Sequence, residues 1–253
     1  KEYAEVFKNR MVLFTVIFLP LFLTALPLVI LYFTGSSEVG AIDSGLPEQL
    51  NAYCPPGLSG GECFQVYMVS QFLLMYLIMP VAIPVAIAAY SIVGEKTTRS
   101  LEPLLATPIS TVELLLGKSL AAAIPAVAAT YLALFIFLAG AYIIVPSKGL
   151  VSALIDARWI LAIFLVGPLM AIMAINVSLI VSSRVNDPRA AEQLSMVVIL
   201  PVLILFFGQI SGLFLINRQL ILILAGILIV LDAALIYIAA RLFQRETILT
   251  RWK

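Results

Sequence analysis

Histidine is missing from this chain of 253 residues, and only 11% of the residues are charged. Without an imidazole group there is no His-activated nucleophile, His metal ligand or imidazole proton carrier. The two cysteines are too few for an iron–sulfur cluster or a zinc site of four thiolates within one chain. A net charge of +1 gives no general attraction for nucleic acid, so no nucleic-acid partner is expected.

A nucleotide-binding loop of the form Gly-x-x-x-x-Gly-Lys-Ser/Thr is also missing. Backbone amides of such a loop hold the phosphates of ATP, so the chain is not expected to hydrolyse ATP alone. A membrane-embedded enzyme has little support, because the apolar runs contain no pair of aspartates. We therefore expect a chain that is not an enzyme and holds no cofactor or metal of its own.

Apolar residues are abundant instead: they make up 62% of the chain, and the mean hydropathy is +1.11. A water-soluble globule cannot cover so much apolar surface, whereas about 20 apolar residues cross a bilayer as one helix. The runs lack the alternation of β-barrel strands. We predict an all-α polytopic membrane protein, a single domain over 1–253 with six transmembrane helices. The predicted spans are 11–33, 66–93, 112–145, 159–181, 194–216 and 220–240, the third with a cytoplasmic extension.

Lysine and arginine positions orient these spans, because cytoplasmic loops carry an excess of both residues. With the N-terminus inside, only Lys148, Arg158 and Arg218 fall in outer segments, and the remaining 12 of the 15 basic residues are cytoplasmic. We expect a multi-pass protein of the cell membrane, surrounded by lipid, with both termini in the cytoplasm.

The two cysteines, Cys54 and Cys63, lie in the long outer loop, 34–65. An oxidising exterior permits a disulfide, and the prolines and glycines between the cysteines suit a tight turn. We predict a Cys54–Cys63 disulfide. The alternative is two free thiols, which would suit a reducing cytosol and the opposite topology.

The cytoplasmic loop 94–117 differs from the apolar runs around it. Ser100 is a suitable N-cap for a short helix. Leu101, Leu104 and Leu105 recur at the spacing of one helix face, and a Ser-Thr-Val-Glu capping box would begin the next helix. The short helix either packs on headgroups or its own bundle, or docks a cytoplasmic partner.

This loop resembles the signature loop of ABC-2 type permeases, the membrane subunits of a large class of ATP-binding cassette exporters. The six-span topology with both ends inside is similar as well, so the resemblance covers the whole chain. The elements that carry it follow the family's order: Glu95-Lys96, Leu101-Glu102, Leu104-Leu105-Ala106-Thr107-Pro108-Ile109-Ser110 and Leu116-Gly117-Lys118.

The resemblance implies that loop 94–117 forms a coupling helix seated in a cleft on an ATP-binding subunit. Leucines would fill the cleft, and charges would fix the orientation at its rim. It also implies two ATPase subunits, which bind ATP and Mg, and a second permease chain, identical or not, with the substrate path between the permeases. The implied coupling residues are Glu95, Lys96, Arg99, Leu101, Glu102, Leu104 and Leu105.

The N-terminal residues, 1–10, place Tyr3, Val6, Phe7 and Arg10 at helical spacing. This pattern is typical of an amphipathic helix in the headgroup plane, and it resembles the elbow helix of the family. The alternative is a frayed end of the first span.

Asp232 is the only acidic residue deep within a predicted span, and Asn176 lies at similar depth in the fourth. An ionised Asp there costs about 2.5 kcal/mol or more, which makes the pair a candidate intramembrane polar site. Either Asp232 faces a cavity and contributes to passage of a substrate or cation, or it is protonated or bonded to Asn176 or a hydroxyl group and holds helices together. Gln71 and Gln209 are expected to form hydrogen bonds between helices.

Prolines predict bends in two spans: Pro80 and Pro84 in the second, and Pro201 in the fifth.

Relatives of the ABC-2 type often have short re-entrant helices between the last two spans. Here only about 217–219 are available, unless 208–216 folds back as a half-helix.

The main alternative function is a secondary transporter driven by an ion gradient. That class often shows internal repeats and midplane ionisable groups. No convincing repeat relates 1–127 to 128–253, and only one carboxylate lies deep. The permease subunit of an ABC exporter is therefore the preferred interpretation.

Overall fold

The computed structural model describes residues 10–36, 54, 57–97, 111–213 and 216–242. Within these ranges six helical segments are long and apolar enough to cross a membrane, and no strand occurs. The predicted all-α fold with six transmembrane helices is confirmed. The segments are Val12–Gly35, Gly60–Ala89, Leu116–Ile144, Lys148–Arg184, Pro188–Ile210 and Arg218–Leu242.

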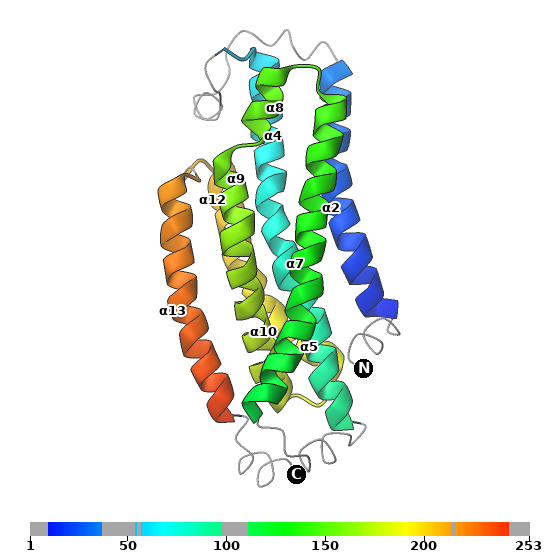
Figure 1. Cartoon of the computed structure of the whole chain (residues 1–253), viewed down its shortest axis with the longest axis vertical. Helices are drawn as coiled ribbons and strands as arrows, with labels where there is room; N and C mark the ends of the chain where they lie inside the picture. The colour runs from blue at the N-terminus through cyan, green and yellow to red at the C-terminus, as the bar shows by residue number, and fades with distance from the viewer. Residues whose placement is uncertain (1–9, 37–53, 55–56, 98–110, 214–215, 243–253) are drawn as a thin grey trace.

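The segments form an elongated bundle (Figure 1). Three of them contain one long helix: α2 (Arg10–Ser36), α7 (Thr111–Ile144) and α13 (Arg218–Leu242). The others are built from shorter helices: α4 (Gly60–Met75) and α5 (Met79–Thr97); α8 (Lys148–Leu154), α9 (Ala157–Leu161) and α10 (Gly167–Arg184); α11 (Pro188–Ser195) and α12 (Leu200–Ile210).

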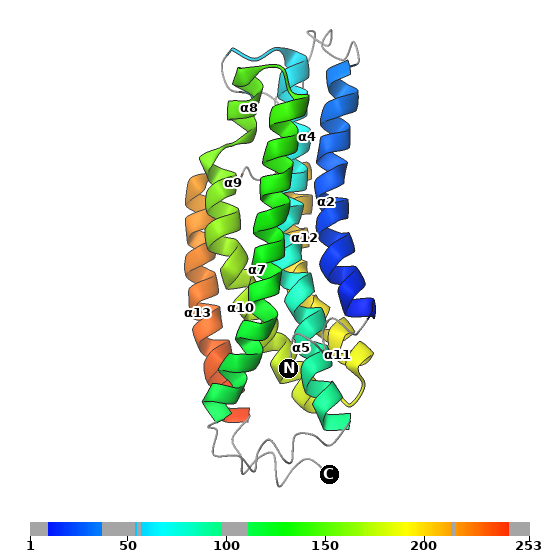
Figure 2. The same cartoon turned by 45° about the vertical axis from the view of Figure 1, so that its right-hand side comes forward.

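The second segment, α4 with α5, forms the centre of the bundle. Its membrane-spanning window is 83% buried, whereas the windows of α2 and α13 are 17% and 22% buried. α5 packs against both α7 and α10, while α2 packs against α7 and α13 against α10. As a result, α2 and α13 stand on opposite flanks (Figures 1 and 2).

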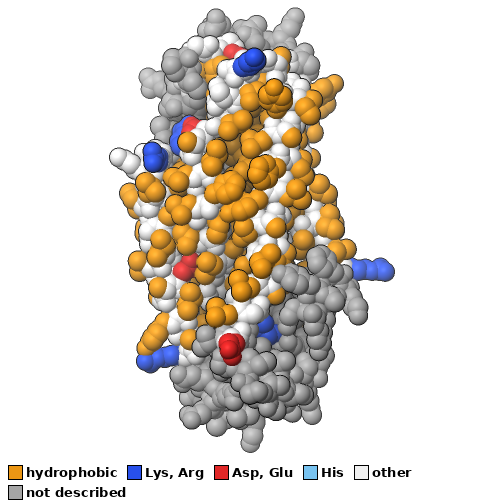
Figure 3. Space-filling view, in the orientation of Figure 1, with side chains coloured by type: hydrophobic (Ala, Val, Ile, Leu, Met, Phe, Trp, Pro, Cys, Tyr) orange, Lys and Arg blue, Asp and Glu red, His pale blue; other side chains and the backbone are white. Residues whose placement is uncertain are grey.

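We call the two ends of the bundle the Arg10 end and the Cys54 end. The Arg10 end holds the start of α2, the end of α5, the start of α7 and the end of α13 (Figure 1). The Cys54 end holds the end of α2, the start of α4 and α8. Between the ends the surface is largely apolar (Figure 3), as a lipid-facing belt requires.

Two helical segments are interrupted where proline predicts a bend. The 3-10 turn η2 (Tyr76–Ile78) separates α4 from α5, and Pro80 follows in the first turn of α5. The 3-10 turn η4 (Met196–Ile199) likewise precedes Pro201 in α12. Proline has no N–H, and its ring clashes with the carbonyl four residues earlier, so it weakens α-helical bonding where it stands. Proline alone does not end a helix here, because Pro84 lies inside α5 and Pro125 inside α7.

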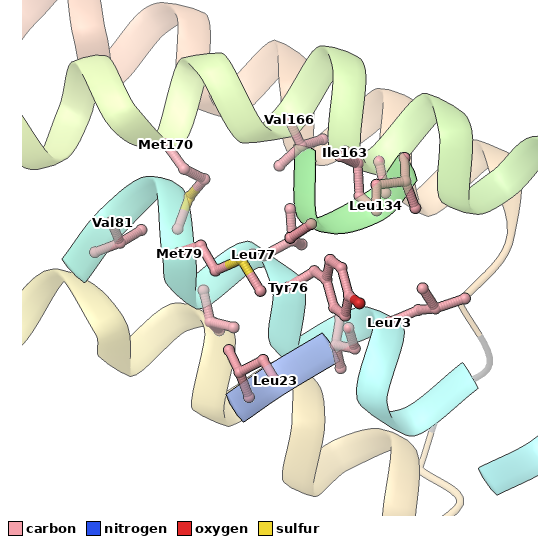
Figure 4. Packing of buried hydrophobic residues seen from close by; sticks show 14 of the residues in the cluster. Leu23, Leu73, Tyr76, Leu77, Met79, Val81, Leu134, Ile163, Val166 and Met170 are labelled. Atoms are coloured by element: carbon pink, nitrogen blue, oxygen red, sulfur yellow. The ribbon is translucent and has the colours of Figure 1, made fainter. Parts of the chain in front are cut away.

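A third interruption, in the fourth segment, was not predicted. The π-helix η3 (Ala162–Val166) joins α9 to α10, and Pro168 follows at the start of α10. A Cβ added to Gly167 would lie 3.8 Å from the Pro80 side chain, so this break packs against the break in the second segment. Figure 4 shows Tyr76 and Met79 across from the residues of the fourth segment.

The fifth segment ends earlier than the predicted span, at Ile210 rather than near 216. Gly212 has a φ of 70°, which glycine adopts without strain. The Leu213 amide donates to the Gly208 carbonyl at 3.0 Å, a bond typical of a helix terminated by glycine. In the described residues, 208–216 therefore does not form a separate half-helix.

Candidate functional site

The helices on either side of loop 94–117 both reach the Arg10 end. α5 ends at Thr97, and α7 begins at Thr111 (Figure 1). The 34 residues of α7 extend for about 51 Å at 1.5 Å per residue, well beyond the roughly 30 Å of a hydrocarbon core. The length of α7 agrees with the extension predicted for the third span.

Most predicted coupling residues lie outside the described residues. Glu95 and Lys96 belong to the last turns of α5, where only the backbone is described. The elbow helix predicted for 1–10 is also outside, except for Arg10, where α2 begins. These roles remain predictions. The undescribed coupling residues are Arg99, Leu101, Glu102, Leu104 and Leu105.

The α5 side of this loop is anchored by α11. Ala89 and Val93 of α5 are almost fully buried and cluster with Ala191 of α11. The Asp187 carboxylate caps α11 by accepting a hydrogen bond from the Arg189 amide at 2.9 Å. The end of α5 is therefore fixed to the start of the fifth segment.

A crevice of about 280 Å³ lies between α7, α10 and α13, toward the Arg10 end. Leu116, Leu120 and Ile236 line it and are each more than half exposed. The crevice thus opens on the outside of the bundle, where lipid would lie. Ser119 and Asn176 are its only polar lining residues among those described. This crevice could not be predicted from the sequence, because apolar residues that line a crevice have the same composition as apolar residues that face lipid.

Asp232 lies in α13, about 15 Å from Leu242 at 1.5 Å per residue. It is 5% exposed, and neither carboxylate oxygen has a hydrogen-bond partner among the described residues. Residues four and seven positions apart share a helix side, so Asp232 lies on the same side of α13 as Ile236 and Ala239. Both of these residues line the crevice.

Asn176 does not bond to Asp232. Its side-chain Nδ2 donates to the Ile172 carbonyl at 2.8 Å, within α10. The interpretation in which Asn176 holds Asp232 by a hydrogen bond is therefore wrong. The structure places Asn176 in the crevice wall and Asp232 one helical turn beyond the crevice residue Ile236.

The expected hydrogen bonds of two other intramembrane side chains are not formed either. Gln71 of α4 and Gln209 of α12 are 6% and 2% exposed, and their amide atoms have no partners in the described part of the chain. A hydrogen bond between helices lies nearer the Cys54 end instead, where Gln65 Nε2 donates to Thr34 Oγ1 at 2.9 Å.

At the Cys54 end, the sulfur atoms of Cys54 and Cys63 lie at disulfide-bonding distance, with their Cα atoms 5.0 Å apart. This agrees with the predicted pairing.

The nearby run 57–61, Gly-Leu-Ser-Gly-Gly, has the spacing of a hydrolase nucleophile motif. Ser59 instead caps α4: its amide donates to the Glu62 carboxylate at 2.9 Å, and its Oγ accepts from the Glu62 amide.

Comparison with known families shows which family this chain belongs to. The family described as ABC-2 family transporter protein matches residues 1–223. The chain belongs to the ABC-2 transporter family. Membrane components of this family are normally not catalytic, and they generally work with an ATP-binding subunit. A search of curated proteins found no significant match.

The ABC-2 match extends from the N-terminus into the first turns of α13. It includes loop 94–117 and the two helices that carry it. Asp232 and the α13 wall of the crevice lie beyond the matched residues, so the family match does not bear on them.

Proposed function

We propose that this ABC-2 chain is the permease subunit of an exporter. It forms the substrate path together with a second permease chain, and two separate ATP-binding subunits drive it. Each ATP-binding subunit docks on the coupling helix of loop 94–117. ATP and Mg bind in those subunits, and the permease itself catalyses no reaction.

The observation that carries this proposal is the family match over 1–223, which spans loop 94–117 together with α5 and α7. The lengths of these helices support it, because they bring both ends of the loop to one end of the bundle. The anchoring of α5 by α11 supports it further. A force applied at the loop would pass along α5, which belongs to the most buried segment, into the centre of the bundle.

The distribution of charge supports a cytoplasmic Arg10 end in the plasma membrane. Basic residues near this end outnumber those near the Cys54 end, as expected for the cytoplasmic side, and a disulfide at the Cys54 end suits an oxidising exterior. The described basic residues are Arg10, Lys96, Lys118, Arg184, Arg189 and Arg241 toward the Arg10 end, and Lys148, Arg158 and Arg218 toward the other.

Co-purification of the tagged permease with its ATP-binding subunit tests the proposal. Leu104→Asp places a charge on the leucine face, and we expect it to reduce the ATPase recovered with the tagged permease by about tenfold or more. Glu102→Lys should weaken recovery to a smaller extent. Lys148→Glu is the matched control, because it reverses an exposed charge at the opposite end. Equal recovery with all variants would contradict the docking site.

The alternative of a gradient-driven transporter is favoured by one observation, the unpartnered carboxyl group of Asp232. Transport into or out of vesicles containing the permease alone, driven by an ion gradient, would support that alternative. Transport that requires the ATP-binding subunit and ATP would support the exporter.

A further inference from the structure

We propose that the crevice between α7, α10 and α13 and the carboxyl group of Asp232 together bind a small amphipathic cation, a molecule with an apolar body and one positive charge. The role of such a molecule as cargo rests on the proposed function. Its binding does not, because all the residues involved belong to this chain.

The crevice suits the apolar body. Its volume of about 280 Å³ is close to the lower end of the range for small-molecule sites. Its walls are apolar except for Ser119 and Asn176. The exposed rim residues Leu116 and Leu120 place its mouth on the lipid-facing surface, where an amphipathic molecule concentrates.

Asp232 suits the positive charge. Its carboxyl group is buried at 5% exposure and has no hydrogen-bond donor or cation beside it among the described residues. A carboxylate inside a membrane protein is normally paired, because an isolated charge there is costly. A bound cation would supply the missing partner, whereas an anion or an uncharged ligand would not.

Asp232 does not itself line the crevice, and Ile236 is the lining residue nearest to it along α13. Ile236 comes one helical turn after Asp232, about 6 Å along α13. Ile236 is 51% exposed, so its side chain has room to move aside. We therefore assign Ile236 as the residue that controls access from the crevice to the carboxyl group.

Binding of radiolabelled hexyltrimethylammonium to the full chain in lipid nanodiscs tests this site, with binding to empty nanodiscs subtracted. Hexyl sulfate, which has the same alkyl chain and the opposite charge, is the matched probe. The wild-type chain should retain the ammonium probe and not the sulfate. Asp232→Asn should weaken binding of the ammonium probe by about 30-fold or more, and Asp232→Glu should retain most of it.

Substitutions in the crevice test the path to the carboxyl group. Ile236→Ala should tighten binding of the ammonium probe, and Ala239→Phe should abolish it by filling the crevice. Ile223→Phe is the control, since Ile223 is exposed on α13 and does not line the crevice. If Asp232→Asn does not fold, Ile236→Ala and Ala239→Phe still decide the question.

Equal binding of the ammonium and sulfate probes would overturn the proposal, as would ammonium binding that is unaffected by Asp232→Asn or Ala239→Phe. The outcome is independent of the coupling test. Loss of ATPase recovery in Leu104→Asp together with no specific ammonium binding would refute the cation site alone.

Discussion

Gly140 of α7 faces Leu28 of α2 so closely that an added Cβ would lie 2.8 Å from both Leu28 Cδ1 and Cδ2. Small residues allow membrane helices to approach in this way. α2 stands on the flank of the bundle and is mostly exposed to the surroundings, so its position depends on close contacts with α7.

Replacement of Gly140 should therefore loosen α2. We expect Gly140→Ile to lower the free energy of unfolding by about 1–3 kcal/mol, because the larger side chain overpacks the contact. Adding Leu28→Ala should restore part of the loss. Unfolding in mixed micelles measures both. Gly226→Ile on α13 is the control, because no atom lies within 4 Å of its added Cβ; equal losses at the two glycines would contradict the prediction.

Tyr76 packs edge-on against Phe137 where the second segment breaks, with ring centroids 6.3 Å apart. Tyr76 is fully buried, and its hydroxyl group has no hydrogen-bond partner within the described residues. The nearby Thr24 hydroxyl donates to the Pro20 carbonyl rather than to the Tyr76 oxygen. Tyr76→Ala should cost about 3–5 kcal/mol, whereas Tyr76→Phe should change stability by less than about 0.5 kcal/mol. A loss well above 1 kcal/mol in Tyr76→Phe would reveal a bonded hydroxyl group.

The Cys54–Cys63 pair closes a short loop, with a sequence separation of 9. Loss of this crosslink frees the unfolded chain, so stability should fall by roughly 3 kcal/mol or less. Thermal unfolding of the Cys54→Ser, Cys63→Ser double variant measures the loss. Reductant should lower the Tm of the wild type to that of the double variant and leave the variant unchanged. A wild type insensitive to reductant, with no difference from the variant, would mean that the crosslink contributes nothing.

Ala191 of α11 is fully buried against α5. Ala191→Leu should push α11 away from α5 at a cost of about 1–3 kcal/mol. If α5 carries force from the coupling loop, the same variant should also reduce stimulation of the ATPase by the permease, measured as ATP turnover of the complex. Ala190→Leu, one position away and only partly buried, is the control. Full stimulation in a destabilised Ala191→Leu would show that this packing does not transmit the motion.

The six spans, the cysteine pairing and the breaks at Pro80 and Pro201 could be predicted because each depends on nearby residues. About 20 apolar residues suffice for a span, and a proline weakens helical bonding locally. The sequence does not tell which prolines break a helix, since Pro84 and Pro125 lie inside continuous helices. The boundary of the fifth span was less predictable, because 208–216 is apolar enough to continue the helix and the left-handed Gly212 ends it.

The sequence by itself thus determined which stretches enter the membrane, since transfer free energy is a property of the local composition. Only the tertiary structure decided which side chains meet. It directed the Asn176 amide to the Ile172 carbonyl rather than to Asp232, and it left a crevice where α7, α10 and α13 pack incompletely. Apolar side chains that face lipid, a neighbouring helix or a crevice have the same composition, so their roles depend on the helix rotations that packing selects.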